Sequence, residues 1–264
     1  MKNGGLVSNA GGVALDGVRG LVTGANRGLG RAFVDELLER DACVVYAAAR
    51  NADSVAVDDD RIVPVTLDVT NAADVEAAAA ACGDSALVIN NAGLMLQSPF
   101  ISVRNEDAAR REMETNYFGT LEVARRFAPV LAANGGGALV NMLSIVSFYA
   151  VPFNASYCAS KAAQWALTNA LRIELNGQGT LVVGVHAGFI DTDMANGVDQ
   201  PKVAPRDVAR QALDAVEAGI PEVLADAETR WVKRAVPDDQ TLLYPDLQRS
   251  WDAVLSPWNN TGSR

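Results

Sequence analysis

The sequence predicts a doubly wound α/β fold, in which helices cover both faces of one parallel, seven-stranded β-sheet. Three observations lead to this prediction. Short segments that are apolar throughout recur along the chain, as expected of strands buried on both faces. Segments with apolar residues at helical spacing separate these strands from one another. Finally, no internal repeat, linker or change of composition divides the 264 residues, so the alternation extends over a single domain.

Each element follows from its own local pattern. The first strand ends at residues 20–23, and the helix expected over residues 31–40 carries its apolar residues at helical spacing. The longest helix is expected to end before three consecutive glycines, because glycine weakens a helix. In chain order, the other elements are expected as strands at residues 42–49 and 61–67, a helix at 72–82, a strand at 86–90, a helix at 106–134, a strand at 138–143, a helix at 154–176, a strand at 181–186, a helix at 206–217 and a strand at 222–225.

The composition is that of a soluble globular protein, and it argues against several classes of partner. Apolar residues make up 49% of the chain and charged residues 20%. With 22 Lys and Arg against 32 Asp and Glu, the net charge of −10 disfavours nucleic acid and anionic membrane surfaces. No segment approaches the roughly 20 consecutive apolar residues that span a bilayer. We therefore expect a cytoplasmic protein with neither a nucleic-acid nor a membrane partner.

The two ends of the chain differ from its centre. Residues 1–16 lack the apolar core of a signal peptide and are expected to form a flexible N-terminal tail. Residues 17–264 are expected to form the single domain, with a C-terminal helical extension over about residues 227–258. The three cysteines have no paired spacing, and the one histidine, His186, falls in a strand and is interpreted as a core residue. Neither a disulfide framework nor a metal site is predicted.

A glycine-rich turn lies where the first strand passes into the first helix. Its glycines are spaced as G-x-x-x-G-x-G within residues 23–30. Glycine lets the backbone turn tightly, and the free amides at the start of a helix can hold a pyrophosphate. The alternative is a turn that binds no ligand. The strand-turn-helix setting favours a dinucleotide-binding domain, and the residues expected to contact the dinucleotide here are Gly24, Asn26, Arg27, Gly28, Leu29 and Gly30.

Four further motifs end the expected strands or lie in the expected helices. In chain order they are Asn90-Asn91-Ala92-Gly93, Asn116-Tyr117-Phe118-Gly119, Asn141-Met142-Leu143-Ser144 and Tyr157-Cys158-Ala159-Ser160-Lys161. Together with the glycine-rich turn, these motifs resemble the short-chain dehydrogenase/reductase family over residues 18–225. The resemblance implies a Rossmann-like fold, a nicotinamide dinucleotide cofactor and an oxidoreductase of the carbonyl-reductase type.

The resemblance also implies roles for individual residues. It implies a catalytic tetrad of Asn116, Ser144, Tyr157 and Lys161, the last two of which also contact the cofactor. The other implied cofactor contacts are Asp68 and Val69 at the adenine, Asn91, Ala92 and Gly93 at the ribose, Ile190 and Thr192 at the nicotinamide carboxamide, and Gly188 through a close backbone approach. The chain departs from the family where Ala187 replaces the usual proline before Gly188. Because Gly188 is kept, we expect activity to be kept as well.

The spacing of the tyrosine and the lysine suits proton transfer. Tyr157 and Lys161 are four residues apart, so they lie on one face of a helix. A tyrosine with the ordinary pKa of ~10 is a poor proton shuttle at neutral pH, and a nearby ammonium is expected to lower that pKa. Ser144 is expected to polarise a substrate carbonyl, and Asn116 to hold a water in the proton path. The predicted reaction is the reversible reduction of a carbonyl to an alcohol.

The end of the second strand indicates which cofactor is preferred. Relatives that prefer NAD usually carry an acidic residue there, which accepts hydrogen bonds from the ribose hydroxyls. This chain has Arg50 instead, and Arg27 lies in the glycine-rich turn. Two guanidinium groups at one place repel each other unless an anion such as a 2′-phosphate lies between them. We therefore predict that NADP(H) is preferred over NAD(H); the alternative is a pair of solvated arginines.

The expected pocket predicts a small hydrophobic carbonyl or alcohol as the substrate. Its expected walls are apolar and aromatic, and they comprise Leu94, Met95, Ile145, Val146, Phe148, Tyr149, Val151, Phe153 and Phe189. Two other functions remain open. A 3-oxoacyl thioester reductase is weakly opposed by the negative charge, because acidic carrier proteins prefer a basic docking patch. A non-catalytic NADP-sensing protein of the same fold commonly lacks the tyrosine or the lysine, and both are present here.

The C-terminal segment and the two long helices predict self-association. After Pro245, the residues Leu247, Trp251, Val254 and Leu255 fall on one helical face that must be covered. The resemblance implies pairing through the helices expected at residues 106–134 and 154–176. We therefore expect a homodimer or a homotetramer, with the dimer slightly favoured.

Overall fold

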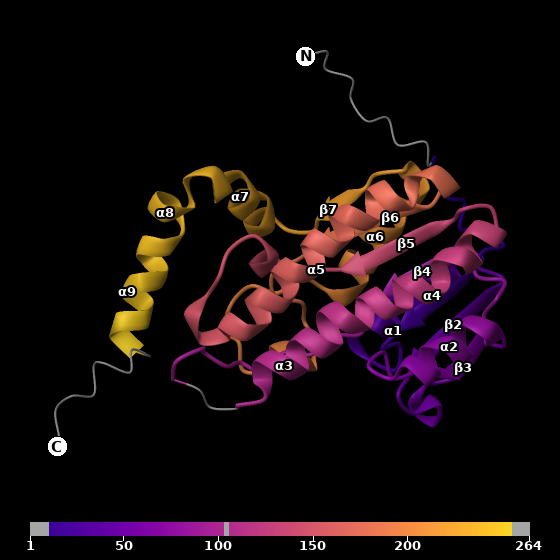
Figure 1. Ribbon diagram of the computed structural model, residues 1–264, viewed down its shortest axis with the longest axis horizontal. Helices are drawn as coiled ribbons and strands as arrows, with labels where there is room; N and C mark the ends of the chain where they lie inside the picture. The colour runs from indigo at the N-terminus through magenta and orange to yellow at the C-terminus, as the bar shows by residue number, and fades with distance from the viewer. Residues whose placement is uncertain (1–10, 103–105, 255–264) are drawn as a thin grey trace, which may run out of the picture.

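Seven parallel strands form one sheet in the order β3-β2-β1-β4-β5-β6-β7 (Figure 1). The computed structural model describes residues 11–102 and 106–254. The strands are β1 (Arg19–Thr23), β2 (Val44–Ala49), β3 (Ile62–Thr66), β4 (Leu87–Asn90), β5 (Ala138–Met142), β6 (Leu181–His186) and β7 (Glu222–Leu224). The predicted doubly wound, seven-stranded sheet is confirmed. Its order reverses at β1, where the chain crosses from β3 back to β4, and such a reversal creates a crevice at the carboxyl ends of the strands.

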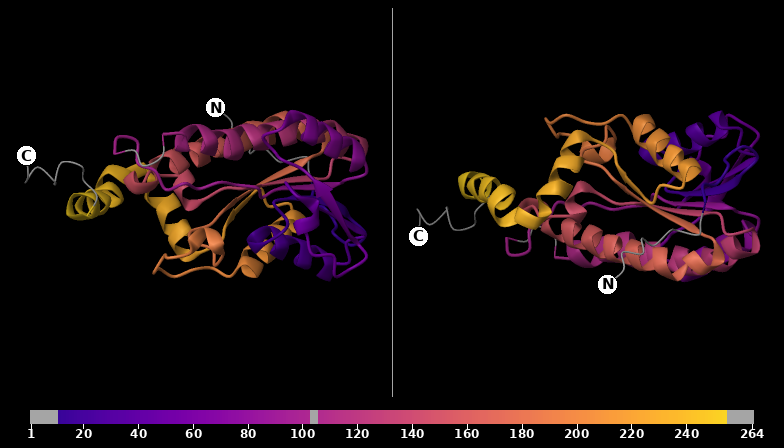
Figure 2. Two further views of the ribbon diagram at one scale, coloured as in Figure 1. Left: turned by 90° about the horizontal axis from the view of Figure 1, so that it is seen from below. Right: turned by 90° about the horizontal axis from the view of Figure 1, so that it is seen from above.

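Helices cover both faces of the sheet (Figure 2). One face is covered by α1 (Gly28–Glu39) and α6 (Pro205–Ala218), and the other by α2 (Ala72–Ala81), α4 (Thr120–Ala133) and α5 (Ala155–Glu174). Neighbouring residues of one strand serve opposite faces, because strand side chains alternate. In β1, Val22 packs under α1 and α6, whereas Leu21 packs under α2 and α4. This alternation explains why the strands are apolar throughout.

The long helix predicted over residues 106–134 is divided in the structure. It consists of α3 (Ala108–Met113), one π-helical turn η2 (Glu114–Gly119) and α4. A π turn holds one more residue than an α turn, and such turns are frequent at functional sites. The apolar spacing of the sequence continues through this turn, so the sequence predicted an uninterrupted helix.

The described part of the expected N-terminal tail contacts the domain. Residues 11–16, assigned to a flexible tail from the sequence, pack against the domain. The Val13 amide donates a hydrogen bond of 3.0 Å to the Val216 carbonyl in α6, and Leu15 is completely buried. The local composition of small residues could not reveal this, because the contact is made with a helix far along the chain. Residues 1–10 lie outside the described part of the chain.

The C-terminal extension is helical, as far as the structure describes it. It comprises α7 (Ala227–Ala235), α8 (Asp239–Leu242) and α9 (Tyr244–Val254), and α9 projects beyond the sheet (Figures 1 and 2). Of the predicted apolar stripe, Leu247 packs against the cluster around Tyr157, and Leu243, just before α9, is buried. The side chain of Val254 and all of Leu255 lie outside the described part. Within the described residues, no helix is long and apolar enough to cross a membrane.

Candidate active site

The residues predicted for the site lie at one edge of the sheet. Because all strands are parallel, their carboxyl ends share this edge, and each predicted segment follows one strand. In sheet order, Asp68 follows β3, Arg50 follows β2, Gly24 follows β1, Asn91 follows β4, Ser144 follows β5 and Gly188 follows β6. The topology therefore brings together segments that are far apart in the sequence.

The glycine-rich turn has a backbone that requires glycine and a helix start that suits an anion. Gly24 and Gly28 have positive φ angles of 66° and 55°. A Cβ atom on Gly30 would lie 2.0 Å from the Gly24 carbonyl oxygen. Among the described residues, no side chain caps the start of α1 at Arg27, and its first turn holds no acidic residue. Free amides at a helix start without a side-chain cap fit a phosphate group. The turn therefore fits the dinucleotide that the sequence predicts.

A threonine missed by the sequence analysis joins this turn to the next strand. The Thr23 hydroxyl accepts hydrogen bonds of 3.0 Å from the amides of both Asn91 and Ala92. In return, the Asn91 side chain donates to the carbonyls of Thr23 and Gly24 at 2.9 and 3.2 Å. These bonds lock together the turns after β1 and β4. The sequence held one signal for this contact: Thr23 ends β1 and Asn91 follows β4, so two polar residues stand at the ends of strands that pair in the sheet.

The catalytic candidates of α5 meet Ser144 at the end of β5. Tyr157 and Ser144 are both buried, and the Ser144 side chain acts on the phenol, because it lowers the pKa of Tyr157. The Lys161 ammonium lies 5.8 Å from the centroid of the Tyr157 ring. It donates hydrogen bonds of 2.8 Å to the Met142 carbonyl and to Oε1 of Gln164. An ammonium has three protons, so one remains for a further acceptor such as a ribose hydroxyl.

Burial sets the protonation of this pair, contrary to the expectation that the lysine lowers the tyrosine pKa. Burial raises the pKa of Tyr157 above its ordinary value, and the hydrogen bond from Ser144 offsets only part of that rise. Burial also lowers the pKa of Lys161 from 10.5 to about 7. The lysine is therefore only partly charged at neutral pH, which limits its effect on the phenol. Tyr157 holds its proton, the form that a proton donor needs.

The π turn places Asn116 against the segment that follows β4. Its Oδ1 accepts a hydrogen bond of 2.8 Å from the Leu94 amide, and its Nδ2 donates to the Leu94 carbonyl and the Ser160 hydroxyl, also at 2.8 Å. A Cβ atom on Gly93 would lie 3.4 Å from Asn116 Oδ1 and 3.9 Å from Lys161 Nζ. The structure thus brings Asn116, Gly93 and Lys161 together, with the Asn116 amide bound to protein groups.

The two arginines predicted at the cofactor phosphate are both exposed. Arg27 donates a hydrogen bond of 3.0 Å to Asp193, and both side chains are largely exposed. Arg50 is exposed directly after β2, where it pairs with none of the described acidic residues. Asp68, the predicted adenine contact, accepts hydrogen bonds from the amide and hydroxyl of Thr70 through one carboxylate oxygen. The local sequence could not reveal the partner of Arg27, because Asp193 belongs to the segment after β6.

The segment after β6 lies over the glycine-rich turn. Thr192 is so near that its Cγ2 would lie 3.2 Å from a Cβ atom on Gly28. Ile190 forms an isolated bridge with Val203, and Gly188 donates its amide hydrogen to Asp226 at 2.8 Å. The predicted residues of this segment are therefore anchored at both ends, and Asp226 is a partner that the sequence analysis did not select.

One expected wall residue belongs to the core. The Phe148 ring stacks on His186 at 4.2 Å between centroids and meets the edge of Trp165 at 5.0 Å. His186 is fully buried, as predicted, and burial lowers its pKa to about 4. Its Nδ1 lies 3.1 Å from the Ser144 carbonyl oxygen. The sequence predicted that Phe148 lies in apolar surroundings. It could not predict that the ring packs on His186 and Trp165, because only the fold brings these residues together.

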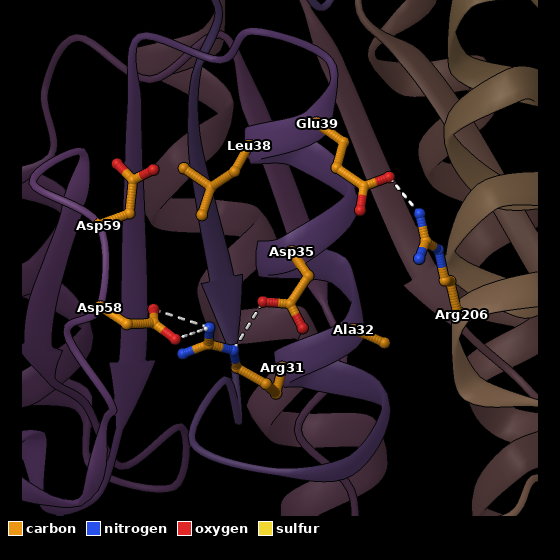
Figure 3. A pocket seen from close by; sticks show the side chains of 8 residues that line it. All are labelled: Arg31, Ala32, Asp35, Leu38, Glu39, Asp58, Asp59 and Arg206. Atoms are coloured by element: carbon orange, nitrogen blue, oxygen red, sulfur yellow. Dashed lines mark hydrogen bonds and ion pairs between the residues drawn. The ribbon is translucent and has the colours of Figure 1, made fainter.

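A separate hollow of about 370 Å³ lies beside α1, away from the carboxyl ends of β4 to β6 (Figure 3). Both of its arginines are paired with carboxylates that also line the hollow. Arg31 contacts Asp35 and Asp58, each at 2.7 Å, and Arg206 contacts Glu39. The Arg31 guanidinium is therefore already paired with two carboxylates, whereas Arg50 pairs with none of the described acidic residues. In the described residues, no group of acidic, histidine and cysteine side chains could hold a metal ion.

Comparison with known protein families identifies the family of this chain. The family model described as short chain dehydrogenase matches residues 20–202. The chain therefore belongs to the short-chain dehydrogenase family, whose members are oxidoreductases that use a nicotinamide cofactor.

Three proteins that are similar to this chain differ in their identity to it and in their cofactors. A short chain dehydrogenase from Burkholderia cenocepacia, crystallised with NADP, is 40% identical, with a TM-score of 0.83 over 93% of this chain and 100% of its own. D-erythrulose reductase from Gallus gallus is 34% identical over 67% of this chain and 73% of its own. A short chain dehydrogenase/reductase from Burkholderia phymatum in complex with NAD is 23% identical, with a TM-score of 0.76 over 87% of this chain and 96% of its own; it supports the fold alone.

Proposed function

We propose that this chain reduces the carbonyl group of a hydrophobic ketone or aldehyde with NADPH, in a reversible reaction. The observation that carries the proposal is the grouping of three buried residues, in which Ser144 acts on the pKa of Tyr157 and the Lys161 ammonium lies 5.8 Å from the centroid of the tyrosine ring. These groups follow β5 or begin α5, at the same edge of the sheet as the glycine-rich turn. The described residues thus offer a proton donor and a carbonyl-polarising hydroxyl next to a site that fits a dinucleotide.

Each residue has a defined task in this reaction. A nicotinamide cofactor held at the glycine-rich turn would supply the hydride that reduces the carbonyl carbon. Ser144 donates a hydrogen bond to the carbonyl oxygen, which stabilises the negative charge that develops there. Tyr157 transfers its proton to the same oxygen. Lys161 offers its remaining proton to a cofactor ribose hydroxyl, and Asn116 holds the Leu94 segment and Ser160 around the lysine.

Several observations support NADPH as the cofactor. Arg50 stands directly after β2 and has no acidic partner among the described residues. Arg27 already binds a carboxylate, Asp193, so its guanidinium has an affinity for anions at this place. A bound 2′-phosphate would offer both arginines a stronger, doubly charged partner. The similar Burkholderia cenocepacia protein, crystallised with NADP, points the same way.

The substrate class follows from the surroundings of Tyr157. The tyrosine belongs to an apolar cluster with Ile145, Val146 and Val151, and Met95 and Tyr149 pack at its border. Phe153, just before α5, and Met194, in the segment after β6, are exposed apolar residues. Such a lining favours hydrophobic carbonyl compounds over carboxylates or sugar phosphates. The Gallus gallus relative, named a reductase of a ketone, supports the reductive direction.

A cofactor oxidation assay tests the proposal. Wild-type protein is mixed with NADPH or NADH and a panel of aromatic and aliphatic ketones and aldehydes, with glucose 6-phosphate and pyruvate as polar controls. We expect NADPH consumption with apolar carbonyls and little with the polar controls. Turnover with none of the carbonyl compounds, despite measured NADPH binding, would contradict the reductase function.

The chain is also proposed to act as a homodimer or homotetramer. Exposed apolar side chains on the helices at residues 106–134 and 154–176 support this, since Phe118 is 48% and Ile173 74% exposed. A partner copy would cover these residues.

A further inference from the structure

The Asp226 carboxylate joins two elements of different function. It caps α7 by accepting hydrogen bonds from the Thr229 amide at 2.7 Å and the Thr229 hydroxyl at 2.8 Å. The amide binds Oδ1 and the hydroxyl binds Oδ2, and Oδ2 also accepts a hydrogen bond of 2.8 Å from the Gly188 amide, in the segment after β6. The first two contacts are those of an ordinary helix cap. The hydrogen bond from Gly188 joins the cap to a segment outside the helix, so helix capping does not account for it.

The hydrogen bond to Gly188 completes the fixation of one peptide group. The peptide between Ala187 and Gly188 has a carbonyl, which accepts a hydrogen bond of 2.8 Å from the Ile145 amide. Its amide hydrogen goes to Asp226. One peptide plane is therefore held at both of its polar groups, from the β5 side by the residue after Ser144 and from the β7 side by Asp226. Alanine leaves φ free to vary at this position, whereas proline would restrict it.

We infer that Asp226 is a positioning residue for the cofactor, an inference that rests on the proposed function. Its carboxylate holds the Ala187–Gly188 peptide and thereby the start of the segment that carries Ile190 and Thr192. That segment lies over Gly28 of the glycine-rich turn. If the peptide is free to rotate, the segment loses its fixed approach to the cofactor, so binding weakens although no cofactor contact has been removed.

The same carboxylate ties this segment to the surroundings of Tyr157. The helix that it caps, α7, packs through Val232 and Ala235 into the apolar cluster that contains Tyr157 and Ile145. Asp226 thus links the cofactor side of the site with the wall around the proton donor. A cap that served only α7 would have no reason to affect the cofactor.

The test separates the two roles of the carboxylate. Asp226→Ser keeps a good helix-capping oxygen but is too short to hold Gly188 as well. Asp226→Asn is the second variant: the Thr229 amide binds one carboxylate oxygen and the Gly188 amide binds the other, so the single acceptor oxygen of asparagine cannot serve both amides. We expect the Kd for NADPH, measured by fluorescence titration without substrate, to rise about tenfold in each variant. We expect KM for NADPH to rise with it, while kcat with saturating cofactor changes much less.

A rescue and a control make the result specific. Ala187→Pro, introduced into each Asp226 variant, is expected to return the Kd to within about threefold of wild type, because the ring restricts φ at the freed peptide. Proline removes no backbone hydrogen bond here, since the Ala187 amide donates none to the described residues. Asp246→Ser makes the same substitution at an exposed residue in the first turn of α9, outside the segments assigned to the cofactor, and should leave the Kd unchanged.

The outcomes distinguish this inference from the proposed function. A wild-type chain that binds neither NADPH nor NADH would overturn both. A wild-type chain that binds NADPH while both Asp226 variants bind it equally well would overturn this inference alone. Failure of Ala187→Pro to restore binding would likewise overturn it. A variant that unfolds is replaced in the comparison by the other, whose Kd decides between these results.

Discussion

The two halves of the site are built in different ways. On the side of β5 and α5, Tyr157, Ser144 and Lys161 are buried, and the lysine is held by two hydrogen bonds. On the side of β1 and β2, Arg27 and Arg50 extend into solvent, and only Arg27 has an acidic partner among the described residues.

This difference indicates which half determines the chemistry and which half determines the choice of cofactor. Buried groups without solvent are already in position, so they determine the chemistry and tolerate little change. Exposed charges acquire their arrangement only when a ligand arrives, so they discriminate between cofactors and can be replaced at little cost to folding. Substitutions in each half test this division, and loss of the proton donor should have the greatest effect.

The buried half should fail completely when its proton donor is removed. Tyr157→Phe keeps the ring but loses the hydroxyl, and we expect turnover to fall by at least ~100-fold, the range typical of lost general acid catalysis. The Kd for NADPH should stay near the wild-type value. Ser144→Ala should also lower turnover, and the two losses should be less than additive because both hydroxyls act on one oxygen. Near-normal turnover of Tyr157→Phe would refute its role.

The exposed half should change the choice of cofactor and leave the chemistry intact. Arg50→Asp removes a cation and adds repulsion at a 2′-phosphate, so the preference for NADPH over NADH in kcat/KM should fall by about 30- to 1000-fold. The turnover number with saturating NADH should be kept. Arg234→Asp makes the same charge change in α7 and serves as the control. The arginine hypothesis is wrong if wild type already prefers NADH, or if Arg50→Asp leaves the ratio unchanged.

A pH titration examines the contact between the two halves, which is Lys161. Its pKa of about 7 in the free protein means that it loses its proton as the pH rises above that value. A ribose hydroxyl prefers the charged donor, so the affinity contributed by the ammonium is present below this pKa and is lost above it. We expect the Kd for NADH to rise with pH above 7, by at most about tenfold per unit. Lys161→Met should show weak binding and a flat profile; an equally steep profile in this variant would assign the titration to another group.

The smallest effect on activity is expected from the subunit interface. Ile173→Glu places a charge on the exposed face of α5, where it should lower the mass measured by light scattering toward that of a monomer. Activity per chain should change by no more than about twofold if the site lies within one subunit. Ile220→Glu, at an exposed position that follows α6, is the matched control. A monomeric wild-type mass at micromolar concentration would refute the homo-oligomer.

The sequence predicted the elements and the grouping of the site, because both depend on local patterns and on one topological rule. Alternating strands and helices imply parallel strands, which bring Gly24, Ser144 and Gly188 to one edge. Directions and partners could not be predicted in this way. The π turn around Asn116 leaves the apolar spacing unchanged, and the ion pair of Arg27 joins residues that only the folded chain brings together. Likewise, the protonation of Tyr157 follows from burial, which the spacing of Tyr157 and Lys161 does not reveal.

The order of the strands has a consequence for the chain while it is being synthesised. The apolar layer above β1 needs α6 as well as α1, and it includes residues from Leu15 to Ala225. Translation at about 5–20 residues per second separates the appearance of these two helices by on the order of ten seconds. During that interval the nascent chain exposes the apolar side of α1 and of the first strands. We therefore expect chaperones that recognise apolar segments to bind it on the ribosome, and rapid overexpression to favour aggregation.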